Sequence, residues 1–204
     1  MFIPFIQGFG MGGGLIVAIG AQNAFVLSHG VRKNHSFIIP LICSICDALL
    51  IMAGIAGVGA FVAANPFFTS LAAWGGAVFL FWYGFKAFCS ALKGGKLDSD
   101  AKTRKSLQSA IIATLAITLL NPHVYLDTII LLGSISGQYQ GNGRIFFGAG
   151  AMSASFIWFF SLSLGGQMLA PFFRKKAAWR LLDSLVCATM WIIAFSLIYQ
   201  EIVK

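Results

Sequence analysis

The stretch ITLLNPHVYLDTIILLG, residues 117–133, begins and ends like a helix that crosses a membrane but is polar at its centre. The central residues are Asn121, Pro122, His123, Tyr125 and Asp127. A charged group in the middle of a bilayer costs about 2.5–3.5 kcal/mol on insertion scales, so it normally faces a partner or a water-filled cavity. Proline interrupts helical hydrogen bonding. The stretch therefore predicts a broken membrane helix that carries a functional polar site.

Composition places the rest of the chain in the membrane as well. Of the 204 residues, 58% are hydrophobic and 10% are charged, whereas a typical soluble domain has about 25% charged residues. We therefore expect an all-α integral membrane protein. The net charge of +8 is interpreted as a topology signal rather than as a nucleic-acid surface. The N-terminal MFIPFIQGFG has no basic n-region, so no cleaved signal peptide is expected.

Six apolar segments are each long enough to cross a hydrocarbon core of about 30 Å, which takes about 20 helical residues. They cover residues 4–28, 37–63, 67–90, 108–133, 145–169 and 182–200. The loops after the first, third and fifth segments hold eleven Lys and Arg residues, against two on the opposite side. The positive-inside rule therefore places these three loops in the cytoplasm and both termini in the periplasm.

A charged linker, KGGKLDSDAKTRKS at residues 93–106, divides the chain into two halves of three spans each. We expect residues 1–92 to form the first three-helix repeat and residues 107–204 the second, with the linker in the cytoplasm. Because each half has an odd number of spans, the two halves enter the membrane in opposite orientations. This arrangement is typical of the inverted repeats of secondary transporters.

The first helix of each half is predicted to be broken. GAQNAFVL in the first half and LLNPHVYL in the second place Asn23 and Asn121 98 residues apart. We expect helix 1 to break near Gly20 and helix 4 at Pro122. The proline would also free the backbone carbonyl of Thr118, and such a carbonyl is tolerated at membrane depth where it lines a cavity.

Two carboxylates lie inside apolar segments, Asp47 in the second and Asp127 in the fourth. Polar residues of the fourth segment recur at intervals of four and three, which places them on one helical face. They are Thr114, Thr118, Asn121, Tyr125 and Thr128. His123 and Asp127 share an adjacent face. Such a face either lines an aqueous path or makes hydrogen bonds between packed helices, and the added carboxylate, imidazole and amide favour the path.

The polar groups suit an organic cation with several hydrogen-bond donors. No Lys or Arg clearly occupies the membrane centre, since Lys86 lies near a helix end and can extend to the interface. His29, His35 and His123 are too scattered for a metal site, and the chain has no P-loop for ATP. We expect no metal, no cofactor and no enzymatic activity.

Three other features have structural explanations. The two G-x-x-x-G pairs, Gly8/Gly12 and Gly10/Gly14, indicate close helix packing. Asp183, three residues after Arg180, is expected to form a surface ion pair near a helix N-terminus. The oligomeric state is not determined by these patterns, although glycine-rich faces allow a homo-oligomer.

Two motifs carry a family resemblance. IGAQNAFVL, followed by a basic loop, and LNPHVYLDT closely resemble the bacterial lysine/arginine exporter family, in its basic-amino-acid branch, and the resemblance covers essentially the whole chain. It implies gradient-driven export of L-arginine or L-lysine, and of analogues such as canavanine, across the cytoplasmic membrane without ATP, for example by antiport. The residues that match the motifs are Gln22, Asn23, Asn121, Pro122, His123, Tyr125 and Asp127.

We assign roles to these residues as hypotheses. Asp47 and Asp127 would attract the side-chain cation or the α-ammonium group of the substrate. Gln22, Asn23 and Asn121 would hold the α-amino-acid end. Tyr125 is a further candidate for substrate binding. His123 is a candidate proton carrier together with Asp127, because histidine titrates near neutral pH.

Two alternatives differ in class. Cys43 and Cys46 form a C-x-x-C, so the chain could be a membrane thiol–disulfide relay, although two small residues packed within a helix explain the pair as well. A passive organic-cation pore would use the same polar residues. Lysine and arginine are not distinguished by these patterns, since both are long cations with the same α-end.

Overall fold

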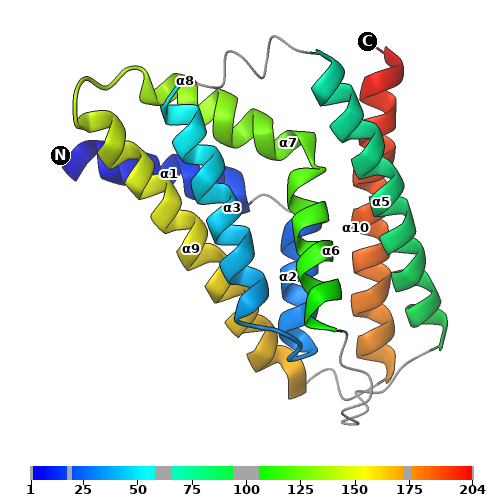
Figure 1. Cartoon of the computed structure of the whole chain (residues 1–204). Helices are drawn as coiled ribbons and strands as arrows, with labels where there is room; N and C mark the ends of the chain where they lie inside the picture. Colours follow the sequence, from blue (N-terminus) through cyan, green and yellow to red (C-terminus); the bar gives the residue numbers. More distant parts are fainter. Residues whose placement is uncertain (1, 18–19, 58–65, 94–105, 172–175, 204) are drawn as a thin grey trace.

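A computed structural model describes residues 2–17, 20–57, 66–93, 106–171 and 176–203, and their regular structure is entirely helical (Figure 1). The elements in chain order are α1 (Phe2–Val17), α2 (Ala21–Val31), α3 (Ile38–Ile55), α5 (Pro66–Lys93), α6 (Leu107–Leu119), α7 (Pro122–Tyr125), η2 (Leu126–Leu131), α8 (Leu132–Ser136), α9 (Gly143–Leu169) and α10 (Lys176–Val203). Of these, η2 is a π-helix that joins α7 to α8 without a gap. The predicted all-α fold is confirmed for the described residues.

Within the described residues, four unbroken helices are long and apolar enough to cross a membrane. They are Ile38–Ile55, Ala73–Leu92, Gly143–Leu169 and Arg180–Val203. Two pairs of helices are each bent at a short break, and each pair can form one further span. The first pair is α1 and α2, which meet at 79°, and the second is α6 with the segment His123–Ser136, which meet at 63°. These four to six spans confirm a multi-pass membrane protein, and the bends lie where the sequence predicts broken helices.

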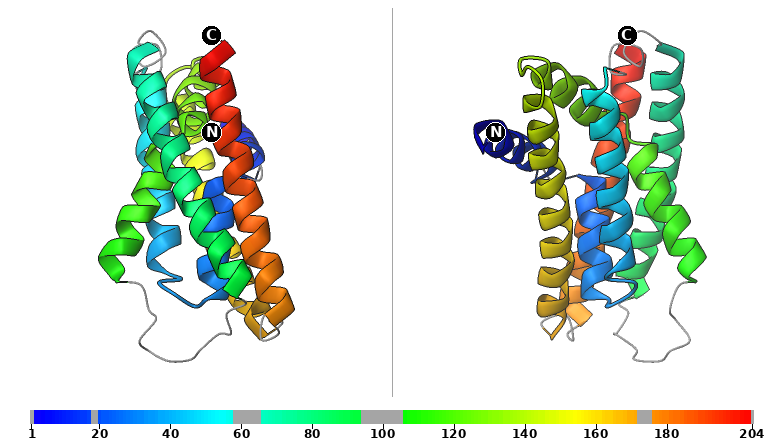
Figure 2. Two further views of the ribbon diagram at one scale, coloured as in Figure 1. Left: turned by 90° about the vertical axis from the view of Figure 1, so that its right-hand side faces the viewer. Right: turned by 60° about the vertical axis from the view of Figure 1, so that its left-hand side comes forward.

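The helices pair in a way that relates the two halves of the chain. In each half a bent pair comes first, an unbroken helix follows (α3 or α9), and a helix of 28 residues ends the half (α5 or α10). The two 28-residue helices pack side by side, while α1 packs along α9 (Figure 1 and Figure 2). Residues 94–105 of the predicted linker lie outside the described residues.

Close contact between α1 and α9 depends on glycine. A Cβ added at Gly8 would overlap the backbone carbonyl of Phe147, and one at Gly12 would lie 2.8 Å from the Cα of Ala151. Gly8 and Gly12 therefore lie on the face of α1 that contacts α9, as expected for a G-x-x-x-G pair. The packing predicted for the second pair is wrong: Gly10 and Gly14 lie on another face, where an added Cβ would have nothing within 4 Å.

A second close approach holds the π-helical segment in place. Gly54 of α3 lies so near η2 that an added Cβ would be 2.7 Å from the carbonyl oxygen of Thr128 and 2.8 Å from that of Ile129. Gly133 of α8 faces the same residue, since a Cβ added there would be 2.7 Å from the carbonyl oxygen of Gly54. This packing fixes a locally widened helix that carries Asp127, and π-helical turns are frequent at functional sites.

One predicted ion pair is wrong. Asp183 is 3% exposed, and it pairs with Arg32 at the end of α2 rather than with Arg180. Its other carboxylate oxygen accepts a hydrogen bond from the Ser90 hydroxyl of α5 at 2.5 Å. The sequence did not reveal this pair because its members are 151 residues apart. The end of the bundle that carries Arg32, Lys33 and Arg180 is called the basic end below.

Candidate substrate-binding site

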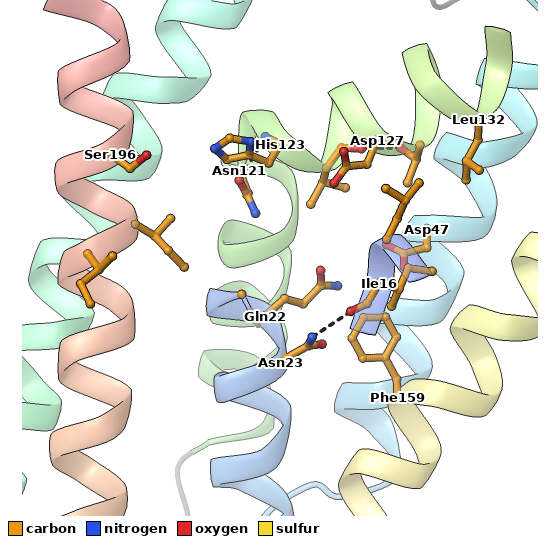
Figure 3. Close-up of a pocket in the computed structure, with 16 residues that line it drawn as sticks. Ile16, Gln22, Asn23, Asp47, Asn121, His123, Asp127, Leu132, Phe159 and Ser196 are labelled. Carbon is orange, nitrogen blue, oxygen red and sulfur yellow. Dashed lines mark hydrogen bonds between the residues drawn. The ribbon is translucent and has the colours of Figure 1, made fainter. Parts of the chain in front are cut away.

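A cavity of about 370 Å³ lies between the two helix bends (Figure 3). Its polar lining residues are Gln22, Asn23, Asp47, Asn121, His123, Asp127, Thr128 and Ser196. Apolar side chains that include Ile16, Phe159 and Ile193 complete the wall. The volume is within the range of about 300–1,000 Å³ that is usual for small-molecule sites. Residues from both halves of the chain therefore meet around one space, and this space is called the central cavity.

The first bend is held together by Asn23. Its amide nitrogen donates to the carbonyl oxygen of Ile16 at 2.8 Å, and its amide oxygen accepts from the indole N–H of Trp158 at 3.2 Å. Asn23 thus connects the last turn of α1 to α9 across the bend. Gly20 lines the cavity just before α2 with an extended backbone (φ −132°, ψ 171°). Asn23 is therefore placed to stabilise the bend as well as to line the cavity.

Gln22 offers a donor to the central cavity. Its side chain is 8% exposed, and among the described residues its amide nitrogen has no hydrogen-bond partner. A buried donor that lacks a partner costs about 1–3 kcal/mol. Figure 3 shows this side chain extending from α2 in the direction of Asp47. A ligand with an acceptor group would satisfy the donor and recover that cost.

The second bend is a helix start as much as a helix break. The side-chain oxygen of Asn121 accepts a hydrogen bond from the backbone N–H of His123 at 3.1 Å, as an N-cap residue does. Pro122 is the first residue of α7, where its missing N–H is no loss. The amide nitrogen of Asn121 points down into the central cavity (Figure 3).

Tyr125 is not among the residues that line the central cavity. Its hydroxyl donates to the carbonyl oxygen of Leu119 at 2.6 Å, in the last turn of α6. The acceptor used at this bend is thus the carbonyl of Leu119, one residue after the predicted Thr118. Thr118 itself is fully buried. The 63° bend also separates the predicted polar stripe, so that only Asn121 and Thr128 of that stripe reach the cavity.

Asp47 is the most deeply buried charge-bearing group of the cavity. It lies in α3 and is 2% exposed, and one carboxylate oxygen accepts a hydrogen bond from the Ser155 hydroxyl of α9 at 2.8 Å. The same side chain lines the central cavity. Carboxylates hold about four acceptor positions, so Ser155 positions Asp47 without satisfying it.

Asp127 and His123 also line the cavity, and in Figure 3 they lie above Gln22 and Asn23. They are four residues apart, but the chain between them passes from α7 into η2. Both side chains are half-buried. Within the described part of the chain, the ion pairs do not include either Asp47 or Asp127. Lys86, the nearest basic residue in the third segment, is exposed, and its ammonium lies 3.5 Å from the centroid of the Trp82 ring.

The geometry supports an organic cation rather than a metal or a redox pair. Among the described residues, no group of three or more His, Cys, Asp and Glu side chains could hold a metal ion. Cys43 and Cys46 are buried free thiols, and neither lines the central cavity. Two carboxylates with unfilled acceptor positions and two amide groups remain, and these can bind ammonium or guanidinium groups together with a carboxylate.

Sequence patterns missed several residues that hold the site together. Ser155 and Trp158 of α9 position Asp47 and Asn23, and Ser196 of α10 lines the cavity. A single serine or tryptophan in an apolar helix does not by itself indicate a binding site, because serine also makes hydrogen bonds between packed helices. The polar spacing of α9 alone (Ser153 and Ser155 in MSASF) gave a weak signal.

Comparison with known proteins places these features in a family. The family model described as LysE type translocator matches residues 14–201. The arginine exporter protein ArgO of Salmonella typhimurium strain LT2 is 44% identical over 198 residues, covering 97% of this chain and 94% of the relative. The proteins of the same name from Escherichia coli K12 and Shigella flexneri are each 43% identical with the same coverage. No solved structure matches the chain.

The match extends over almost the whole chain and includes both bends and the central cavity. Together with the membrane-spanning helices, it confirms the predicted place of the chain as a multi-pass protein of the bacterial inner membrane. The family consists of translocators rather than enzymes. The chain belongs to the family of LysE type translocators.

Proposed function

We propose that the protein exports basic L-amino acids, arginine or lysine and analogues such as canavanine, from the bacterial cytoplasm by secondary active transport. The observation that carries the proposal is the pair Asp47 and Asp127, which line one cavity and, among the described residues, form no ion pair with Lys or Arg. The relatives named as arginine exporters support the class of substrate. A cation with hydrogen-bond donors satisfies both carboxylates.

The two ends of the substrate are recognised by different groups. We assign the guanidinium or ammonium of the side chain, and the α-ammonium, to Asp47 and Asp127. The amide nitrogens of Gln22 and Asn121 are donors for the α-carboxylate. The N-terminus of α2 adds a positive dipole beside Gln22, as at the discontinuous helices of other transporters. Tyr125 acts indirectly, since it holds the bend through Leu119.

Coupling to the proton gradient is assigned to His123 with Asp127. Histidine changes its charge near neutral pH, and both side chains line the cavity that the substrate occupies. A proton and a cationic substrate would compete for the same carboxylate, which is the basis of antiport. An export rate that is unchanged by a collapsed proton gradient would leave membrane potential as the driving force.

Architecture and orientation belong to the same proposal. Residues 1–92 and 107–204 are assigned as two inverted repeats joined by a cytoplasmic linker at 93–106, and the repeated order of bent pair, single span and 28-residue helix supports this. The basic end faces the cytoplasm, since Lys and Arg favour that side. Both termini then lie in the periplasm. In Figure 1 the C-terminus lies at the top of the bundle, whereas α1 begins at its side.

Transport in proteoliposomes tests the function directly. Counterflow of labelled arginine and lysine at two pH values measures substrate preference and proton coupling. Accumulation against a concentration gradient that an uncoupler abolishes is the expected result. Equilibration without accumulation would show a passive pore, and absence of arginine and lysine counterflow with correctly folded protein would refute the substrate class.

A further inference from the structure

The carboxylate of Asp183 is built into the basic end of the bundle and is not part of the central cavity. Arg32 pairs with one of its oxygens, and the Ser90 hydroxyl donates to the other at 2.5 Å. The three side chains come from the end of α2, from α5 and from α10. The carboxylate is nearly fully buried, whereas the side chain of Arg32 is 36% exposed. The guanidinium of Arg32 can therefore leave toward water, and Asp183 cannot.

Tightly packed side chains separate Asp183 from the central cavity. Along α2, Phe25 lies between Gln22 of the cavity and Arg32, and along α10, Met190 lies between Ile193 of the cavity and Asp183. Phe25 and Met190 are fully buried. The ring of Tyr83 on α5 lies 5.4 Å from that of Phe25, and all three residues belong to one apolar cluster. The cavity is thus closed toward the basic end.

We propose that Asp183 is an acceptor site for the guanidinium or ammonium of a substrate arriving at the basic end, and that Arg32 occupies this site when substrate is absent. The inference rests on the proposed function, because it assumes a basic amino acid as the substrate. An arriving guanidinium carries the same group as Arg32 and competes with it for the same carboxylate. Binding of substrate then breaks the contact between α2 and α10 that keeps this end closed.

The same contact explains how the site distinguishes a loaded state from an empty one. Asp183 without any cation would be a buried unpaired carboxylate, which is strongly unfavourable. The end therefore stays closed by Arg32 until another cation replaces it. Ser90 holds the carboxylate in both states, since its hydrogen bond does not involve Arg32. Arg32 and substrate are alternative partners of one fixed group.

Two single variants test the inference because they break the same ion pair in opposite ways. In Arg32→Ala the competitor is removed and the acceptor remains, so the arginine concentration that gives half-maximal export should fall. In Asp183→Asn the acceptor is lost, so that concentration should rise by about tenfold, which corresponds to about 1.4 kcal/mol. The measurement is the initial rate of labelled arginine transport in proteoliposomes. Lys33→Ala removes a neighbouring exposed charge and serves as the matched control.

A second measurement detects whether the basic end is closed and does not depend on transport. The variant Ile193→Cys, in a background without the four natural cysteines, is labelled with an impermeant maleimide in inside-out vesicles. Labelling should be slow in the otherwise unchanged protein, about tenfold faster in Arg32→Ala, and faster when L-arginine is added instead of sodium chloride at equal ionic strength. The exchanged pair Arg32→Asp with Asp183→Arg should restore slow labelling while half-maximal export still requires more arginine.

The outcomes separate the inference from a purely structural ion pair. If Arg32→Ala and Asp183→Asn shift the half-maximal arginine concentration in the same direction, or do not shift it, the acceptor role is wrong. If labelling of the cysteine at Ile193 is equal in Arg32→Ala and in Lys33→Ala, the closing role is wrong. A parent protein that transports neither arginine nor lysine would overturn the proposed function instead, and that result is independent of the comparison of labelling rates.

Discussion

Replacing Asp47 by Asn removes a charge from the centre of the cavity with little change in shape. Asp47 is 2% exposed, and the oxygen that accepts from the Ser155 hydroxyl at 2.8 Å has a counterpart in the asparagine amide. We therefore expect Asp47→Asn to insert and fold normally. The variant lacks only the negative charge that faces the cation of the substrate.

The magnitude follows from the burial of this carboxylate. Exposed ion pairs contribute about 0–1 kcal/mol because water screens them, whereas hydrogen bonds to charged groups contribute about 1.5–3 kcal/mol. Since Asp47 is enclosed by α3 and α9, the larger value applies. A factor of ten in affinity corresponds to about 1.4 kcal/mol. We expect Asp47→Asn to weaken arginine binding roughly ten- to hundredfold, measured by counterflow at increasing arginine concentration.

The control is the same chemical change outside the cavity. Asp100→Asn, in the linker, should leave counterflow unchanged. Thermal unfolding in detergent establishes that Asp47→Asn is folded, so that a loss of transport reports binding. Unchanged arginine affinity in both Asp47→Asn and Asp127→Asn would show that neither carboxylate binds the cation, and the assignment of the central cavity would fail.

Three further predictions concern the bends and the packing. Asn121→Ala removes the cap of α7 and should lower stability by about 1 kcal/mol, measured by thermal unfolding. It should also lower the affinity for arginine, measured by counterflow. Gly8→Ala forces α1 away from α9 and should cost about 1–3 kcal/mol, whereas Gly10→Ala, with nothing within 4 Å, should be neutral; equal melting temperatures would contradict the packing. Cells with the double variant Cys43→Ala, Cys46→Ala should keep canavanine resistance, and its loss at normal protein levels would favour a thiol relay.

Most of the fold could be predicted from local sequence. The apolar segments at 145–169 and 67–90 correspond to α9 and α5 within a few residues, because helices in a membrane are determined by length and apolarity. The sequence GAQN predicts the break before α2. What could not be predicted is the direction after each break, since the 79° and 63° bends depend on packing against other helices.

Several residues of the candidate site could be predicted from the sequence, but their arrangement around the cavity could not. Asp47, Asn121 and Asp127 were recognisable because polar groups are costly in hydrocarbon. The positions of Tyr125 and Thr118 were not, because the polar stripe assumed a straight helix and the bend removes both from the cavity lining. Sequence spacing pairs Asp183 with Arg180 rather than with Arg32, because it gives no information on contacts between distant helices.

Small or polar residues interrupt the apolar membrane helices for two different reasons, and the structure distinguishes the two. Gly8 lets two helices approach, and Cys43 fills a small space in the core, so both are explained by packing alone. Asp47 and Asp127 are costly in an apolar environment, Asn121 caps the helix start at the second bend, and all three line one space. Groups that weaken local structure tend to be retained where function requires them. The three residues come from α3, from the second bend and from η2, and they meet at one cavity. This meeting supports a binding site more strongly than any single one of the three residues does.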